Sequence, residues 1–179
     1  MVNGIHQSSE YIRGFWTYAV EHLHVASISP HNQILILGVA GGTIIHILSK
    51  KFPKAVLTGV DIDAVMIEMG KKYFGLEEMR NLSFVCADAR SYVGKTKKKF
   101  DLVVVDIYIA RDLPDFLLDQ VFLKNIRSIL APRGYVLINY LRDGEYEKKA
   151  YILEKKLRNI FKIVHHTNYL NNRFFLARK

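Results

Sequence analysis

The chain has 179 residues, of which half are hydrophobic and 24% are charged, and its formal net charge is +9. This composition is ordinary for a soluble globular protein with a substantial core. No apolar run is long enough to span a bilayer, and no basic region followed by an apolar stretch marks a signal peptide, so we expect neither.

The single cysteine, Cys86, excludes an internal disulfide and fits a reducing compartment, so a cytoplasmic protein is expected. Because Cys86 lies in the apolar stretch 82–87, we expect a buried, inert thiol. The basic residues are uneven, since Arg13 alone precedes Lys50 and residues 95–99 form the densest cluster. Such a cluster attracts nucleic acid or anionic lipid, but a solvated loop is the favoured interpretation.

Residues 1–33 form a predicted helical extension in front of the first strand. Apolar side chains at helical spacing indicate an amphipathic helix over 8–25, with Ser8 or Ser9 as its cap. This helix either covers one edge of the sheet or reaches over a ligand, and the sequence leaves both open. His22 and His24 have the wrong spacing to share a helical face, so no metal site is expected.

The chain is organised around residues 33–48. An apolar run, 34–37, indicates a buried strand, a glycine-rich turn follows over 38–43, and helical spacing resumes from Ile44. Glycines let the backbone touch a ligand, and amides at the start of the next helix can hydrogen-bond it. We therefore predict the opening of a nucleotide-binding α/β sheet, the alternative being a tight turn without a ligand. Small residues at positions 38, 40 and 42 suit a nucleoside better than a dinucleotide.

Three later strands each end in an acidic residue. The strands 55–60, 82–87 and 101–105 are followed by Asp61, Asp88 and Asp106. Ligands bind at the carboxyl edge of open parallel sheets, so all three acids are expected at one site. Asp61 stands roughly twenty residues past the glycine turn, where an acid accepts from both ribose hydroxyls. The alternative is that Asp61 and Asp63 merely cap the helix expected over 64–74.

The remaining elements complete an α/β pattern. A helix is predicted from Pro114 to about Leu130, a turn over 131–134, a strand over 135–140 and a basic amphipathic helix over 145–160. Two final strands, 161–169 and 173–177, are joined by Asn171 and Asn172, and asparagine tolerates the left-handed conformation of a hairpin turn.

These residues resemble the class I S-adenosylmethionine-dependent methyltransferases, and within them the spermidine synthase-like branch. The resemblance covers residues 34–140. It rests on the turn 38–43, on Val60-Asp61-Ile62-Asp63 with Tyr73-Phe74, and on Asp106, Pro114, the Leu-x-Pro-x-Gly of residues 130–134 and a strand that ends in Asn139. It implies a Rossmann-like fold with a seven-stranded, mostly parallel sheet, an antiparallel C-terminal hairpin strand and helices on both faces. We expect one S-adenosylmethionine-binding domain over 1–179, with the Rossmann-like core over 34–179.

The resemblance also implies the cofactor, S-adenosylmethionine, with S-adenosylhomocysteine as product, and no metal. Asp88 is expected to accept from the adenine amino group, another helix cap being the alternative. Asp106 and Tyr108 are the expected catalytic residues, and Asp106 is suited to orient an amine or take its proton. The full set of predicted cofactor-binding residues is Gly38, Ala40, Gly41, Gly42, Asp61, Ile62, Asp88, Ala89 and Asp106.

The predicted function is methyl transfer to an unknown acceptor, with a small molecule favoured. The Asn/Asp-Pro-Pro-Tyr/Phe signature of amino-methylating relatives is absent after Asp106, which leaves nucleobase and glutamine acceptors without support. One alternative is a polyamine-forming aminopropyltransferase, but its Asp-Ser-Ser-Asp-Pro loop is replaced over 106–110, and we expect no N-terminal β-domain because the first strand begins near residue 34. The other is a non-catalytic nucleoside- or RNA-binding domain. Nucleic acid is not favoured as a partner, no membrane is expected, and a homodimer stays open.

Overall fold

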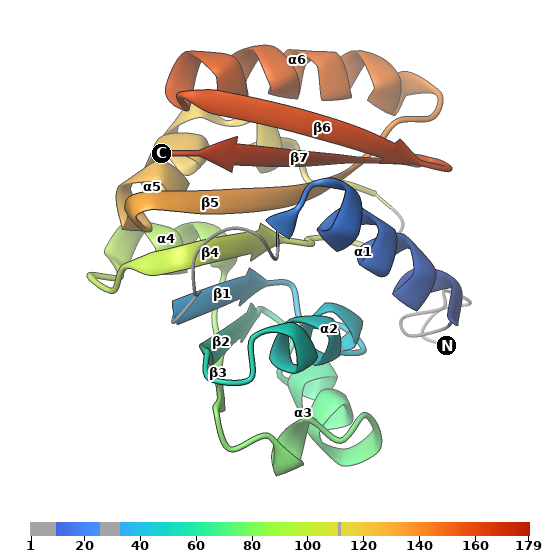
Figure 1. The fold of residues 1–179 in the computed structure, drawn as a ribbon, viewed down its shortest axis with the longest axis vertical. Helices are drawn as coiled ribbons and strands as arrows, with labels where there is room; N and C mark the ends of the chain where they lie inside the picture. The colour runs from blue at the N-terminus through green and yellow to red at the C-terminus, as the bar shows by residue number, and fades with distance from the viewer. Residues whose placement is uncertain (1–9, 26–32, 111) are drawn as a thin grey trace.

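Figure 1 shows the computed structural model of the chain, which describes residues 10–25, 33–110 and 112–179. Its helices and strands are α1 (Glu10–His22), β1 (Gln33–Leu37), α2 (Thr43–Lys51), β2 (Val56–Asp61), α3 (Ala64–Tyr73), β3 (Leu82–Cys86), α4 (Ala89–Lys95), β4 (Phe100–Val105), α5 (Gln120–Ile129), β5 (Leu130–Leu141), α6 (Glu145–Ile160), β6 (Ile163–Tyr169) and β7 (Asn172–Arg178). The expected capping residues Ser8 and Ser9 lie outside the described residues. No helix in the described ranges is long and apolar enough to cross a membrane.

The strands form one seven-stranded sheet in the order β3-β2-β1-β4-β5-β7-β6. Strands β1 to β5 are parallel, and β7 pairs antiparallel with both β5 and β6. This confirms the predicted Rossmann-like sheet with its antiparallel C-terminal hairpin strand. Because β1 pairs with β2 on one side and β4 on the other, the strand order reverses there, and ligands bind beside such a switch point.

Helices cover both faces of this sheet, as the sequence predicts (Figure 1). In β1, Ile34 and Ile36 pack with α1 and α2, whereas Leu35 and Leu37 pack with the face that α4, α5 and α6 cover. A strand with apolar residues on both sides is therefore buried on both faces.

Helix α1 lies on the sheet face beside α2 and also contacts β6. Its Trp16 is 1% exposed, and the ring centroid of Trp16 lies 5.2 Å from that of Phe174 in β7. The described part of this helix therefore covers the sheet, and the hydrogen bond from the Trp16 indole to Asp106 also brings it to the carboxyl edge of the sheet.

Four local predictions were wrong. The turn expected over 131–134 lies inside β5, as an irregularity between the pairs Phe100–Leu130 and Leu102–Tyr135. The helix expected from Pro114 is a 3₁₀ turn over Asp115–Leu118, and α5 begins at Gln120, because the Asp119 side chain caps it by accepting from the Val121 N–H. The hairpin turn is 170–171, since Tyr169 pairs with Asn172 and Leu170 takes the positive φ of 51°. Cys86 is exposed, because β3 is an edge strand, which pairs with β2 on one side and has its other side at the edge of the sheet.

Candidate functional site

The glycine-rich turn after β1 is held tightly against the end of β4. Gly38 has φ of +90°, and a Cβ added to it would lie 2.1 Å from the carbonyl oxygen of Asp106. Gly42 has φ of +72°, and its added Cβ would lie 2.7 Å from the Leu76 side chain. Ala40 also has a positive φ, 41°. Glycine is therefore required at 38 both for conformation and for space, and it is favoured at 42 chiefly by the positive φ.

The turn ends where α2 begins. The N-cap residue of α2 is Gly42, which has no side chain with which to cap the helix. N–H groups at a helix start can donate hydrogen bonds to an anionic group of a ligand, and the helix dipole favours a negative charge there. Gly41 lies in the same turn and is buried.

Asp61, at the end of β2, ties the glycine turn to the sheet. Its Oδ2 accepts from the Val39 N–H at 2.8 Å, and its Oδ1 accepts from the Asp63 N–H at 3.0 Å. A carboxylate has about four acceptor positions, so two remain for ligand hydroxyls. Asp63 alone caps α3, by accepting from the N–H groups of Val65 and Met66. Sequence reasoning missed the contact between Asp61 and the turn.

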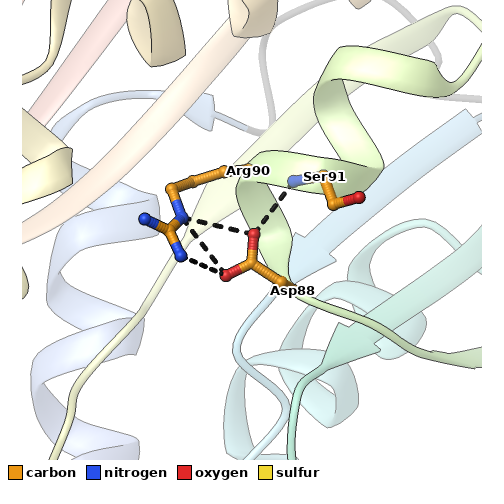
Figure 2. A network of polar contacts seen from close by, with 3 residues as sticks. All are labelled: Asp88, Arg90 and Ser91. Carbon is orange, nitrogen blue, oxygen red and sulfur yellow. Dashed lines mark hydrogen bonds and ion pairs between the residues drawn. The ribbon is translucent and has the colours of Figure 1, made fainter.

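Asp88 caps α4, as the alternative reading of the sequence proposed. Its carboxylate accepts from the Ser91 N–H at 2.9 Å and pairs with the Arg90 guanidinium at 2.9 Å, as Figure 2 shows. The Arg90 hydrogen bonds, followed by the bond from the Ser91 N–H, lower the pKa of Asp88. Ala89 is the first residue of α4, and the Ala87 N–H donates to the Asp61 carbonyl, so β2 and β3 end side by side.

Asp106, at the end of β4, is the most perturbed carboxyl group of the site. Burial raises the pKa of Asp106 to about 6, although hydrogen bonds from Asn139 and from the Trp16 indole favour its ionised form. The Asn139 Nδ2 donates to Oδ1 of Asp106 at 2.9 Å. Part of Asp106 remains accessible to solvent. It is therefore a carboxylate that ionises near neutral pH at the carboxyl edge of the sheet.

Tyr108 lies two residues beyond Asp106 and belongs to the same polar network. Its hydroxyl oxygen accepts from the Asn172 Nδ2 at 3.2 Å, and the same Nδ2 donates to the Asn139 Oδ1 at 2.8 Å. Burial, and then the negative charge of Asp106, raise the pKa of Tyr108 well above its usual range. Tyr108 therefore stays protonated and acts as a hydrogen-bonding group rather than as a base.

The structure thus brings most of the predicted residues to one edge of the sheet. Gly38 packs against Asp106, and Asp61 holds the turn. Sequence reasoning missed Trp16, Asn139 as a partner of Asp106, and Asn172. The available signal was a polar residue, Asn139, inside the otherwise apolar run 135–141, where it is 1% exposed.

The residues of this edge fit S-adenosylmethionine. Asp61 keeps acceptor positions for ribose hydroxyls, the uncapped start of α2 suits a carboxylate, and Ile62, 70% exposed, offers apolar surface for a base. No group of three or more metal-ligating side chains is present among the residues that the structure describes.

Comparison with known proteins gives the family. Residues 34–134 match the family described as "Methyltransferase domain". The chain belongs to this family, whose members in the class I group are S-adenosylmethionine-dependent transferases.

Among curated proteins, the chain is similar to two kinds of enzyme. It is 27% identical over 110 residues to the polyamine aminopropyltransferase of Vibrio vulnificus, which covers 60% of this chain and 37% of that protein. It is 28% identical over 142 residues to the eEF1A lysine and N-terminal methyltransferase homolog of Drosophila melanogaster, and the match covers 73% of this chain and 20% of that protein. It is 27% identical over 173 residues to the polyamine aminopropyltransferase of Saccharolobus solfataricus, and the match covers 90% of this chain and 56% of that protein. The chain therefore spans little more than half, or less, of these relatives.

Two solved structures share the fold. A crystal structure of human methyltransferase-like protein 13 in complex with SAH has a TM-score of 0.72 and 23% identity, covering 93% of this chain and 78% of that one. A probable spermidine synthase from Corynebacterium glutamicum has a TM-score of 0.81 and 19% identity, covering 99% and 67%. Both structures are thus similar to this chain in fold.

Proposed function

We propose that this chain transfers a methyl group from S-adenosylmethionine to the nitrogen of a positively charged amine, a small molecule being the favoured acceptor. The observation that carries the proposal is Asp106. Its pKa lies close to neutral, its described hydrogen-bond partners are the neutral side chains Asn139 and Trp16, and no Lys or Arg among the described residues pairs with it. Its negative charge therefore remains available to an incoming cation.

Charge around this edge supports a cationic acceptor. The segments that follow the parallel strands, residues 61–63, 88–90, 106–115 and 142–147, contain nine acidic and three basic residues. The whole chain, in contrast, has an excess of nine basic residues. Acids gathered near one edge raise the local concentration of a cation and repel an anionic acceptor. Such a pattern favours a polyamine or a lysine side chain over a nucleic acid.

The chain's residues supply orientation and proton management. When bound, S-adenosylmethionine supplies an electrophilic methyl group on its sulfonium, so the protein need only align the acceptor nitrogen and remove its proton. Asp106, ionised above about pH 6, accepts a hydrogen bond from the ammonium and takes one of its protons, which leaves on the neutral nitrogen the lone pair that methyl transfer requires. Tyr108, which stays protonated, aligns the amine by hydrogen bonding. Asp61 keeps the turn in place.

The test is transfer of a labelled methyl group to a panel of polyamines and lysine-containing peptides. We expect at least one amine to be methylated, and we expect Asp106→Asn to lower the rate by about 100-fold or more with little change in S-adenosylhomocysteine affinity. Asp119→Asn is the matched control, because it makes the same chemical change at the cap of α5. Methylation of no amine, or equal rates for Asp106→Asn and the parent, would remove the proposal.

Aminopropyl transfer is the second candidate, because the chain is similar to two polyamine aminopropyltransferases. The resemblance to spermidine synthases places an acid at the fourth position of their turn, facing the amine of the decarboxylated cofactor. This chain has Gly41 there. Without that acid, the turn loses a charge that attracts the aminopropyl amine and repels a cofactor carboxylate.

A further inference from the structure

A chain of hydrogen bonds connects the C-terminal hairpin to Asp106. Asn172, the first residue of β7, donates through Nδ2 to the Asn139 Oδ1 at 2.8 Å and to the Tyr108 hydroxyl at 3.2 Å. Asn139, in β5, donates in turn to Asp106 at 2.9 Å. Residues far apart in the sequence are thus linked across β4, β5 and β7.

The charge of Asp106 determines which side chain donates and which accepts in each of these hydrogen bonds. An ionised carboxylate can only accept, so Asn139 must turn its amide NH₂ toward Asp106. The Oδ1 of Asn139 then faces Asn172, which must present its own NH₂. Both N–H bonds of that NH₂ are used, one on Asn139 and one on Tyr108. Asn139 is 1% exposed, so water cannot easily replace a missing partner.

We propose that Asn172 is a positioning residue that fixes the amide of Asn139 with its NH₂ toward Asp106 and the hydroxyl of Tyr108 beside it. An amide side chain has two orientations that differ only in which atom, oxygen or nitrogen, faces a given neighbour. Asn172 leaves Asn139 a single orientation, because its NH₂ faces the Asn139 Oδ1 and also holds the Tyr108 hydroxyl, the other hydrogen-bond partner of Asn139 on this side. The antiparallel strand β7 therefore sets the ionisation of Asp106 as well as completing the sheet. The catalytic meaning of this inference rests on the proposed function, but the hydrogen-bond network does not.

Loss of Asn172 should therefore favour the protonated form of Asp106. The titratable groups that act on this network are Asp106 itself, Tyr108, which stays protonated, and Asp143, whose charge acts on Tyr108. Neither Tyr108 nor Asp143 takes the place of the Asn139 NH₂ as a hydrogen-bond donor to Asp106. Without Asn172, the Asn139 amide can turn its oxygen toward Asp106, and the pKa of Asp106 rises further.

The experiment is a titration of the Asp106 carboxyl carbon by NMR on the ligand-free protein, with Asp106→Asn used to assign the signal. We expect Asn172→Leu, which is close to isosteric and removes both donors, to raise the titration midpoint by about one unit. Asn171→Leu makes the same change one residue earlier, at an exposed turn position, and should leave the midpoint unchanged. An unchanged midpoint in Asn172→Leu overturns the proposal.

Two further measurements keep the test decisive if Asn172→Leu does not fold. Asn172→Asp keeps the shape but can only accept, so it should raise the midpoint at least as much. In the parent protein, the side-chain amide signals of Asn139 and Asn172 should titrate with the same midpoint as Asp106, and absence of that titration contradicts the network.

Activity gives the readout that links the network to the proposed function. In Asn172→Leu, the acidic limb of the plot of kcat against pH should move with the titration midpoint of Asp106. This shift corresponds to a loss of kcat of about fivefold at pH 6 and to recovery above pH 8. S-adenosylhomocysteine affinity should not change. If the carboxyl titration shifts but no amine is methylated, the network stands and the proposed function fails. If methylation is present but Asn172→Leu leaves both the midpoint and the limb in place, the inference alone fails.

Discussion

Replacing Asp61 by alanine should weaken both the glycine turn and the cofactor site. The carboxylate accepts from the N–H groups of Val39 and Asp63, and Val39 is buried. Alanine leaves the Val39 N–H without its partner in a place that water reaches poorly. The Asp63 N–H lies nearer the surface, where water can take over the hydrogen bond.

The structure sets the size of both effects. One unsatisfied buried donor and one rehydrated donor together cost about 2 kcal/mol of unfolding free energy, or a fall in Tm of about 4–8 °C for a chain of this length. The free acceptor positions of Asp61 would bind two ribose hydroxyls through charge-assisted bonds. Their loss should cost on the order of 3 kcal/mol of binding, which lowers cofactor affinity by about 100-fold or more.

Thermal unfolding and calorimetric titration with S-adenosylhomocysteine measure the two effects separately. Asp63→Ala is the control, because it removes the cap of α3 two residues away. It should cost about 1 kcal/mol of stability and leave cofactor affinity intact. Unchanged affinity in Asp61→Ala, or an equal loss of affinity in Asp63→Ala, would refute the assignment of Asp61 to the ribose.

Two further predictions concern stability. Gly38→Ala should lower the free energy of unfolding by about 3–5 kcal/mol, because it adds a clash with the Asp106 carbonyl to a left-handed φ. Gly75→Ala, with φ of +65° and open space around it, should lower it by about 1–2 kcal/mol. Urea unfolding compares the two variants, and similar losses of stability would contradict the close approach at Gly38. Folding raises the pKa of Asp106 from 3.8 to about 6, so the stability of the parent protein falls as the pH rises between these values. Asp106→Asn should therefore be more stable than the parent by roughly 1–3 kcal/mol at pH 8, and this advantage should vanish near pH 4. Urea unfolding of the parent and of Asp106→Asn at both pH values tests this prediction. An equal difference in stability at the two pH values would show that the ionisation of Asp106 is not the cause of the difference.

The sequence predicts the sheet and the edge at which the acids meet because these depend on local patterns. Apolar runs that end in Asp61, Asp88 and Asp106 locate the carboxyl ends of three strands. Gly38, which directly follows an apolar run, indicates a turn without any knowledge of the tertiary structure. These features are encoded within a few residues of each other, so they can be recognised without knowing how the chain folds.

The polar network could not be predicted because it depends on contacts distant in sequence. Asn139 lies 33 residues from both Asp106 and Asn172, and Trp16 lies still farther away. The error at the hairpin had the same origin, since the antiparallel register pairs Asn172 with Tyr169 and leaves Leu170 in the turn. Likewise, the exposure of Cys86 follows from the edge position of β3, which strand order determines.

The most direct test of the account is a side-by-side calorimetric titration of S-adenosylmethionine and its decarboxylated form into the parent protein. With Gly41 in place of the acid that the resemblance to spermidine synthases implies, no carboxylate at that position repels the carboxylate of S-adenosylmethionine. Two like charges about 4 Å apart at a partly wet site cost roughly 1–4 kcal/mol, so we predict a preference for S-adenosylmethionine of about tenfold or more. Tighter binding of the decarboxylated form would contradict methyl transfer and favour aminopropyl transfer.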